Sequence, residues 1–120
     1  MTNPELLSLA KAASHNAYAK YSNFAVGAAL LCENGDVYTG CNIENSCGTS
    51  VCAERAAIAN AIIHGNQQFS KMAIFSPHQP NITPCGICRQ YLIEFNDSIK
   101  IITETAEYDI KNLLPHSFHR

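Results

Sequence analysis

Three cysteines at the starts of two separate segments constrain the fold more than any other feature of the sequence. Cys52-Ala53-Glu54 opens an alanine-rich apolar stretch, and Pro84-Cys85-Gly86-Ile87-Cys88 opens a second apolar stretch further along the chain. Both stretches are predicted to be helices, and a helix N-terminus carries partial positive charge that favours a thiolate over a thiol. A fold that brings these two helix ends face to face would place three thiolates around one cation.

Zinc suits this set of ligands, because three sulfur ligands leave a fourth coordination position that a catalytic site keeps for water. The sequence therefore predicts one Zn²⁺ per subunit, bound by Cys52, Cys85 and Cys88. Glu54 is two residues from Cys52 on the predicted helix, so its side chain turns away from the ligand sulfur. We expect its carboxylate to take a proton from water and to deliver one to a leaving group.

Two arginines and a further cysteine stand close to the predicted ligands. Three thiolates make the site negative, and we expect Arg55 and Arg89, each beside a ligand, to offset this charge by hydrogen-bonding thiolate sulfur. A non-catalytic structural zinc site is the alternative, with Cys47 as the fourth sulfur ligand. We favour the catalytic interpretation, because a structural site leaves Glu54 without a role.

Length and composition indicate one small domain that buries part of its surface against copies of itself. The chain has 120 residues, which fits a single domain over residues 1–120. It is 47% hydrophobic and 15% charged, whereas a typical soluble domain is roughly 25% charged. This low charge favours a homo-oligomer.

Charge and cysteine content bear on partners and location. The formal net charge is -2, and the eight basic residues form no run, so we expect no nucleic-acid partner, because phosphate binding needs clustered positive charge. No apolar run approaches the roughly 20 residues of a membrane span, and Met1-Thr2-Asn3-Pro4-Glu5 lacks the regions of a signal peptide. We therefore expect no membrane partner and a cytoplasmic location, where spaced cysteines are metal ligands or core residues rather than disulfides.

Hydrophobic periodicity predicts helices alternating with strands. The first predicted helix is capped by Asn3 and ends near residues 21–23, and the second covers 52–64, is apolar nearly all round and is expected to be buried. The third covers about 85–95, and a short fourth helix is capped by Asp109 and ends at Leu113. The predicted strands are 25–32, 36–42, 72–75 and 99–103, with Asn34-Gly35 as a hairpin turn and a loop over 43–51. This order predicts the α/β class, as a three-layer α/β/α sandwich with a mixed, largely parallel sheet.

Several segments together carry a resemblance to a known family. They are Tyr21-Ser22-Asn23-Phe24-Ala25-Val26-Gly27-Ala28-Ala29-Leu30, Gly40-Cys41-Asn42-Ile43-Glu44-Asn45, Cys52-Ala53-Glu54-Arg55, Pro84-Cys85-Gly86-Ile87-Cys88-Arg89-Gln90 and Leu113-Leu114-Pro115-His116-Ser117-Phe118. Over nearly its whole length the chain resembles the small, zinc-dependent, homotetrameric cytidine deaminases. The zinc motif alone points to the wider deaminase superfamily, and Asn-Ile-Glu-Asn narrows the resemblance to its nucleoside branch.

The resemblance implies hydrolytic deamination of free cytidine or deoxycytidine to uridine or deoxyuridine, with release of ammonia, as in pyrimidine salvage. It implies that Cys52, Cys85 and Cys88 bind zinc and that Glu54 is the proton shuttle. The implied substrate contacts are Asn42 and Glu44 to the ribose hydroxyls, Phe24 in the pocket lining, the backbone of Ala53 and Thr83 at the pyrimidine edge, and Phe118 over the base from a neighbouring subunit. It also implies a homotetramer.

The chain departs from the family pattern in the loop between Glu44 and Cys52. This loop is one residue shorter than usual, and Cys47-Gly48-Thr49 stands where the family has a tyrosine. The departure motivates an alternative substrate within the same chemistry, namely a modified cytosine nucleoside such as blasticidin S or an N4-substituted cytidine.

Overall fold

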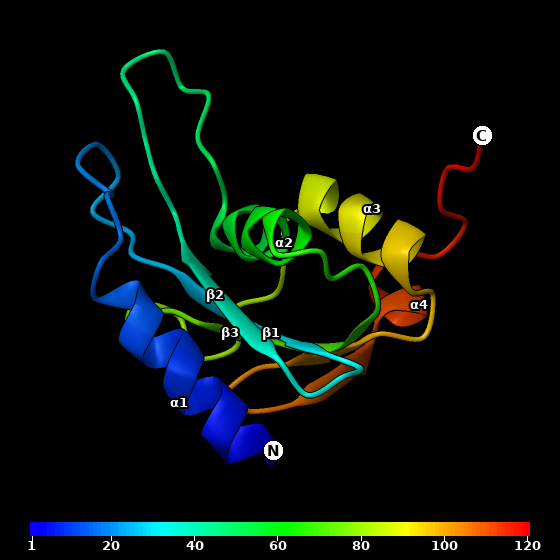
Figure 1. The fold of residues 1–120 in the computed structure, drawn as a ribbon. Helices are drawn as coiled ribbons and strands as arrows, with labels where there is room; N and C mark the ends of the chain where they lie inside the picture. The colour runs from blue at the N-terminus through cyan, green and yellow to red at the C-terminus, as the bar shows by residue number, and fades with distance from the viewer.

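Helices and strands alternate along the chain in the computed structural model, which describes all residues from Met1 to Arg120. The elements are α1 (Asn3–Ser14), β1 (Gly27–Cys32), β2 (Val37–Cys41), α2 (Ala53–Ile63), β3 (Phe69–Phe75), α3 (Gly86–Phe95), β4 (Lys100–Ile102), β5 (Glu107–Asp109) and α4 (Ile110–Leu113). The strands form one sheet in the order β2-β1-β3-β4-β5. α1 covers one face of this sheet, and α2 and α3 lie on the other, so the predicted α/β/α sandwich is confirmed (Figure 1).

The sheet is mixed, but the prediction that it is largely parallel is wrong. Only β3 and β4 pair in parallel, whereas β1–β2, β1–β3 and β4–β5 are antiparallel pairs. The cause is the position of β1, which lies between β2 and β3. The crossover through α2 therefore connects two strands of the same direction that do not touch, and β1 pairs antiparallel with both of them.

Helix α1 begins and ends at other residues than the sequence pattern predicts. Its N-cap is Thr2 rather than Asn3: Glu5 N donates to Thr2 Oγ1 at 3.2 Å, and Thr2 N donates to Glu5 Oε1 at 2.9 Å. This reciprocal pair is a capping box. The helix ends at Ser14 rather than near residue 21, because Tyr18 instead forms a β-bridge with Ile43.

The two faces of the sheet bury separate sets of side chains, as the period of two along a strand requires. Within β1, Ala28 and Leu30 belong to the larger core beneath α2 and α3, whereas Ala29 belongs to the smaller core beneath α1. The smaller core consists of Leu6, Ala10, Ala29, Ala73 and Ile102. The larger core supports the two helices whose N-termini carry the cysteines.

Gly40 in β2 brings the N-terminal half of α2 close to the sheet. A Cβ atom at this position would lie 2.4 Å from the backbone N of Ala57 and 2.5 Å from the backbone O of Ala53. No side chain fits at such distances, so glycine is needed where the helix presses on the strand. This contact fixes the start of α2, and with it Cys52, relative to the sheet.

Other differences from the predicted elements are local. β5 has no counterpart among the predicted strands, and α4 has no side-chain cap from Asp109, whose carboxylate forms an ion pair with Lys100 instead. α2 is not buried all round, since the Ile63 side chain is 83% exposed and Ile62 is exposed as well. No helix in the structure combines the length and the apolar character needed to cross a membrane.

Candidate active site and metal centre

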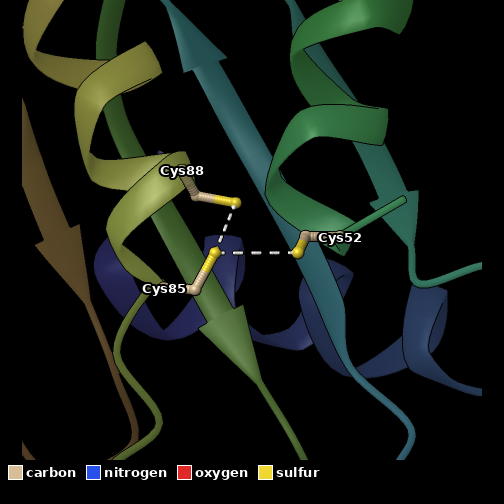
Figure 2. A group of neighbouring side chains, drawn as sticks. All are labelled: Cys52, Cys85 and Cys88. Atoms are coloured by element: carbon tan, nitrogen blue, oxygen red, sulfur yellow. Dashed lines mark hydrogen bonds between the residues drawn. The ribbon is translucent and has the colours of Figure 1, made fainter. Parts of the chain in front are cut away.

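The three predicted zinc ligands lie together where the N-termini of α2 and α3 meet (Figure 2). Cys52 Sγ is 3.8 Å from Cys85 Sγ, and Cys85 Sγ is 3.5 Å from Cys88 Sγ. Cys52 is the N-cap of α2, Cys85 is the N-cap of α3, and Cys88 lies in the first turn of α3. Two segments far apart in the sequence thus contribute one cluster of sulfur atoms.

The local backbone explains why these positions suit thiolates. The carbonyl oxygens of Cys52 and Cys85 accept the first hydrogen bonds of their helices, from Ala56 N at 3.0 Å and Arg89 N at 2.9 Å. Neither cysteine makes a side-chain cap. The first N–H groups of both helices therefore remain without a side-chain partner, and the partial positive charge of two helix ends is directed at the same sulfur cluster.

The sulfur cluster fits zinc. Ligands about 2.3 Å from a tetrahedral Zn²⁺ lie roughly 3.8 Å from one another, close to the observed 3.5 and 3.8 Å. Burial raises the pKa of the Cys52 and Cys88 thiols, so three thiolates side by side need a cation. Cys47 is exposed and lies outside the cluster, so the four-sulfur structural site of the alternative interpretation is not formed.

The two arginines differ, and the expectation for one of them is wrong. Arg55 Nη2 donates to Cys52 Sγ at 3.3 Å and to the backbone O of Ser50 at 3.1 Å, and the contact with Cys52 raises the pKa of Arg55. Arg89 contacts no sulfur. It follows Cys88 directly on α3, so its side chain turns away from that ligand and toward α4.

Arg89 instead joins three backbone and side-chain oxygens behind the cluster. Its Nε donates to the backbone O of Pro84 at 2.6 Å, its Nη1 to the backbone O of Leu113 at 2.7 Å, and its Nη2 to Thr83 Oγ1 at 3.1 Å. The guanidinium therefore fixes the segment just before Cys85 against the end of α4.

A cleft of about 430 Å³ opens beside the sulfur cluster and contains most of the predicted site residues. The predicted residues that line it are Phe24, Asn42, Glu44, Cys52, Ala53, Glu54, Thr83 and Cys85. Five further residues line it without having been predicted from their place in the sequence: Ser22, Val26, Ser50, Val51 and Ile82. Residues from three loops and two helix ends thus share one cavity.

Glu54 lies in this cleft on the first turn of α2 and is only 5% exposed. Burial raises the pKa of its carboxyl above the ordinary value. A carboxyl that takes up a proton more readily than usual is suited to proton transfer near neutral pH.

Asn42 and Glu44 face the cleft and also hold a neighbouring loop. Asn42 Oδ1 accepts from Val26 N at 2.9 Å, and its Nδ2 donates to the backbone O of Phe24 at 2.8 Å. Glu44 Oε1 accepts from the backbone N of Tyr21 and of Ser22, both at 3.0 Å. Ser22 Oγ donates to Glu44 Oε2 at 2.5 Å, and these bonds lower the pKa of Glu44.

Backbone groups at two places in the cleft wall have no backbone partner. Ala53 is the first residue of α2, where helix geometry leaves the N–H without an intrahelical acceptor. Residues 80–84 make no backbone–backbone hydrogen bond at all. The N–H of Ala53 and the backbone of Thr83 are therefore available to a ligand in the cleft.

Phe118 is the one predicted substrate contact that lies outside the cleft. Its side chain is 67% exposed, and its backbone O accepts from Gln90 Nε2 at 3.0 Å, beside the outer face of α3. The structure therefore does not bring Phe118 to the cleft of its own chain.

Two contacts at the cleft wall involve residues that the motifs alone did not identify as functional. Ser22 lies within the Tyr21-Ser22-Asn23 segment, which is a signal for it, and its hydroxyl both donates to Glu44 and accepts from Phe24 N at 3.0 Å. The His78 ring packs on the Phe24 ring with 5.4 Å between centroids, and no motif marks this histidine. Both residues hold side chains that line the cleft.

Comparisons with known proteins agree with this geometry. Residues 1–104 match the family model described as the cytidine and deoxycytidylate deaminase zinc-binding region. The chain is 40% identical to the cytidine deaminase of Sporosarcina psychrophila, over 97% of this chain and 90% of that protein. It is also 40% identical to the cytidine deaminase of Mycobacterium tuberculosis (strain H37Rv), over 88% of this chain and 81% of that protein.

Solved structures share the same fold over their full length. The crystal structure of cytidine deaminase from Burkholderia pseudomallei has a TM-score of 0.91 at 40% identity and covers 98% of this chain and 100% of that one. The crystal structure of cytidine deaminase from Mycobacterium tuberculosis has a TM-score of 0.93 at 35% identity, covering 100% of this chain and 99% of that one.

Proposed function

The chain belongs to the cytidine and deoxycytidylate deaminase family, and from this premise we propose that it deaminates free cytidine and deoxycytidine by hydrolysis. The observation that carries the proposal is the position of Glu54. Its buried carboxyl lies in the same cleft as Cys52 and Cys85 and as the unpaired backbone groups of Ala53 and Thr83. Proton transfer, metal binding and recognition of a polar ring edge are thereby possible in one cavity.

The proposed reaction replaces the amino group at C4 of cytosine by oxygen. Cys52, Cys85 and Cys88 would hold a Zn²⁺ ion, which would lower the pKa of a water molecule enough for it to attack C4 at neutral pH. Glu54 takes one proton from this water and delivers it to N3 of the ring. It then carries the remaining hydroxyl proton to the amino group, the bond between C4 and that nitrogen breaks, and uridine and ammonia result.

The charges in the cleft support a nucleoside without phosphate groups as the substrate. Glu44 remains ionised, because its hydrogen bonds to Ser22 lower its pKa, and a carboxylate accepts hydrogen bonds from ribose hydroxyls. No lysine or arginine lines the cleft. A phosphate group would meet negative charge without a positive partner, so the proposal excludes nucleotides and polynucleotides as good substrates.

The same proposal includes a homotetramer of single-domain chains over residues 1–120, with Phe118 of one subunit closing the cleft of another. Large apolar side chains that remain exposed on one copy support this part; they include Ile63 at 83%, Phe118 at 67% and Ile87 at 59%. All six cysteines are free, which suits the reducing cytoplasm. There the reaction would serve pyrimidine salvage.

A second candidate substrate is a cytosine nucleoside modified at N4. Between Glu44 and Cys52, only Ser50 and Val51 line the cleft, and Cys47 in the same loop is exposed to solvent. These are small side chains where the family pattern has a tyrosine, which leaves room for a larger substituent.

A panel of substrates tests the proposal and separates the two candidates. Zinc-loaded protein is incubated with cytidine, deoxycytidine, deoxycytidylate, N4-methylcytidine and blasticidin S, and the loss of the cytosine chromophore is followed together with release of the amine. We expect cytidine and deoxycytidine to turn over at least about 100-fold faster, by kcat/KM, than deoxycytidylate, a difference of about 2.7 kcal/mol. Turnover of only the N4-substituted compounds would favour the second candidate, and none with any compound would refute both.

A further inference from the structure

One wall of the cleft is held in place by side chains rather than by its own backbone. Ile82 and Thr83 line the cleft from a segment that belongs to no helix or strand. Residues 80–84 make no backbone–backbone hydrogen bond. The position of the Thr83 backbone must therefore depend on side chains nearby.

Asn81 makes three side-chain hydrogen bonds that join this segment to the β4–β5 hairpin. Its Oδ1 accepts from Thr103 Oγ1 at 2.7 Å and from Thr105 Oγ1 at 2.8 Å. Its Nδ2 donates to Tyr108 Oη at 2.7 Å. All three partners are more than twenty residues away in the sequence, so one amide connects two distant parts of the chain.

The hairpin end of this connection is anchored in the protein interior. Thr103 is only 4% exposed, and its Oγ1 also accepts from Ala106 N at 3.1 Å and from Thr105 N at 3.3 Å. Tyr108 packs against the larger core. Asn81 is thus hydrogen-bonded to a fixed turn and to the partly buried Tyr108 ring. These bonds also fix the position of the adjacent Ile82 and Thr83.

We propose that Asn81 is a positioning residue that holds the backbone of Thr83 where it meets the pyrimidine edge. The inference rests on the proposed function, because it assigns the purpose of that backbone to recognition of the base. Arg89 holds the same segment from its other end, through Thr83 Oγ1 and the backbone O of Pro84. The cleft wall is therefore fixed at both ends by polar side chains that do not line the cleft.

The metal ligands beyond this segment depend on other contacts. Cys85 is the N-cap of α3 and Cys88 lies in its first turn, and this helix is held by Leu92 and Ile93, which are buried in the larger core. Loss of the Asn81 amide should therefore move the contact with the base and leave zinc in place. Because a base contact of this kind exists in both the bound substrate and the transition state, its loss raises KM more than it lowers kcat.

The test measures kcat, KM and zinc content for the Asn81→Ala variant with cytidine. We expect KM to rise about 10-fold, corresponding to about 1.4 kcal/mol, while kcat stays within about 3-fold and zinc within 10% of one per chain. Asn81→Asp keeps two acceptor oxygens for the threonine hydroxyls and for a donating Tyr108 hydroxyl, so it should restore KM to within about 3-fold of the wild-type value.

A matched control separates positioning from general stability. Asn66 Nδ2 donates to Tyr38 Oη at 2.7 Å, and Asn66 Oδ1 accepts from Asn34 Nδ2 at 3.0 Å, and none of these three residues lines the cleft. Asn66→Ala removes a similar set of bonds and should lower Tm, yet leave KM unchanged. Equal KM values for Asn81→Ala and wild type, or a rise in KM of the same size in Asn66→Ala, would overturn the proposal.

A measurement without substrate keeps the inference distinct from the proposed function. In zinc-loaded protein with labelled isoleucine methyl groups, Asn81→Ala should shift the Ile82 methyl resonance and increase its mobility, whereas Asn66→Ala should not. The buried Ile101 methyl group serves as an internal reference. An unchanged Ile82 resonance would refute the positioning role even if cytidine turns over, and an inactive wild-type enzyme would refute only the proposed function.

Discussion

The two sides of the cleft present chemistry to a ligand in different ways. The α2 side offers side chains, with Glu54, Asn42 and Glu44 facing the cavity. The α3 side offers the backbone of Thr83 and the sulfur of Cys85, and the residues that fix this wall, Asn81 and Arg89, lie outside the cleft. On the α2 side, residues that stabilise the fold also face the cavity. On the α3 side, the residues that stabilise the wall and the groups that face the cavity are different.

This difference has a consequence for how each side responds to substitution. Asn42 both holds the backbone of Phe24 and Val26 and lines the cleft, so we expect its loss to change stability and binding at once. Asn81 does not line the cleft, and it holds the segment whose Thr83 backbone is available to a ligand there. The α3 side can therefore be altered in its affinity for substrate without a change in any group that faces the ligand.

The largest expected effect concerns the sulfur cluster, which both sides share. Cys85→Ala removes one of three ligands, so zinc binding should fall by at least about 100-fold and turnover should fall to background. Zinc per chain after dialysis, measured by atomic emission, checks this. Retention of a full equivalent of zinc by the variant would show that the cluster is not the metal site.

The next largest effect belongs to the α2 side alone. Glu54→Gln keeps the shape of the side chain but removes its capacity to carry a proton, so kcat should fall by about 10³-fold. Zinc content and Tm should remain those of the wild type, because Glu54 is not a ligand. Steady-state rates with cytidine measure the effect, and a kcat within 10-fold of wild type would break the assignment of proton transfer to this side.

An intermediate effect tests whether stability and binding are linked on the α2 side. Asn42→Ala leaves Val26 N and the backbone O of Phe24 without their partners, which should cost about 1–3 kcal/mol in free energy of unfolding. KM for cytidine should rise in the same variant. Urea denaturation measured beside the kinetics tests the link, and a large rise in KM at unchanged stability would contradict it.

The smallest effects come from the two arginines, which form a matched pair. Arg55→Gln removes the donor to Cys52 Sγ and should weaken zinc binding by about 10-fold. Arg89→Gln removes no bond to sulfur and should leave zinc affinity unchanged, while the lost bonds to carbonyl oxygens lower the free energy of unfolding by about 2 kcal/mol. Competition with a chelator measures the metal affinity, and equal affinities for the two variants would remove the distinction between them.

The parts of the fold that could be predicted from the sequence are those that depend on local pattern. Cys52 and Cys85 stand at helix starts because the apolar stretches that follow them are helical. The direction of the strands could not be predicted in this way, since it depends on β1 lying between β2 and β3. β5 has three residues and only one partly buried side chain, that of Tyr108, too short a pattern to identify a strand.

The site shows the same division between local and distant causes. The three ligands can be identified because their spacing is a property of the sequence. The partners of Arg89 cannot, because its side chain reaches the end of α4, and neither can those of Asn81, which are two threonines and a tyrosine in a later hairpin. Hydrogen bonds between distant side chains have no signature in one sequence.

The different roles of the two sides are tested most directly by one comparison of kinetic constants. Zinc-loaded Glu54→Gln and Asn81→Ala are assayed with cytidine beside the wild type, and kcat and KM are separated for each. We predict that Glu54→Gln lowers kcat by about 10³-fold with KM little changed. We predict that Asn81→Ala raises KM by about 10-fold with kcat little changed. If both variants changed the same kinetic constant, or if Glu54→Gln kept the kcat of the wild type, the assignment of proton transfer to the α2 side and of positioning to the α3 side would be contradicted.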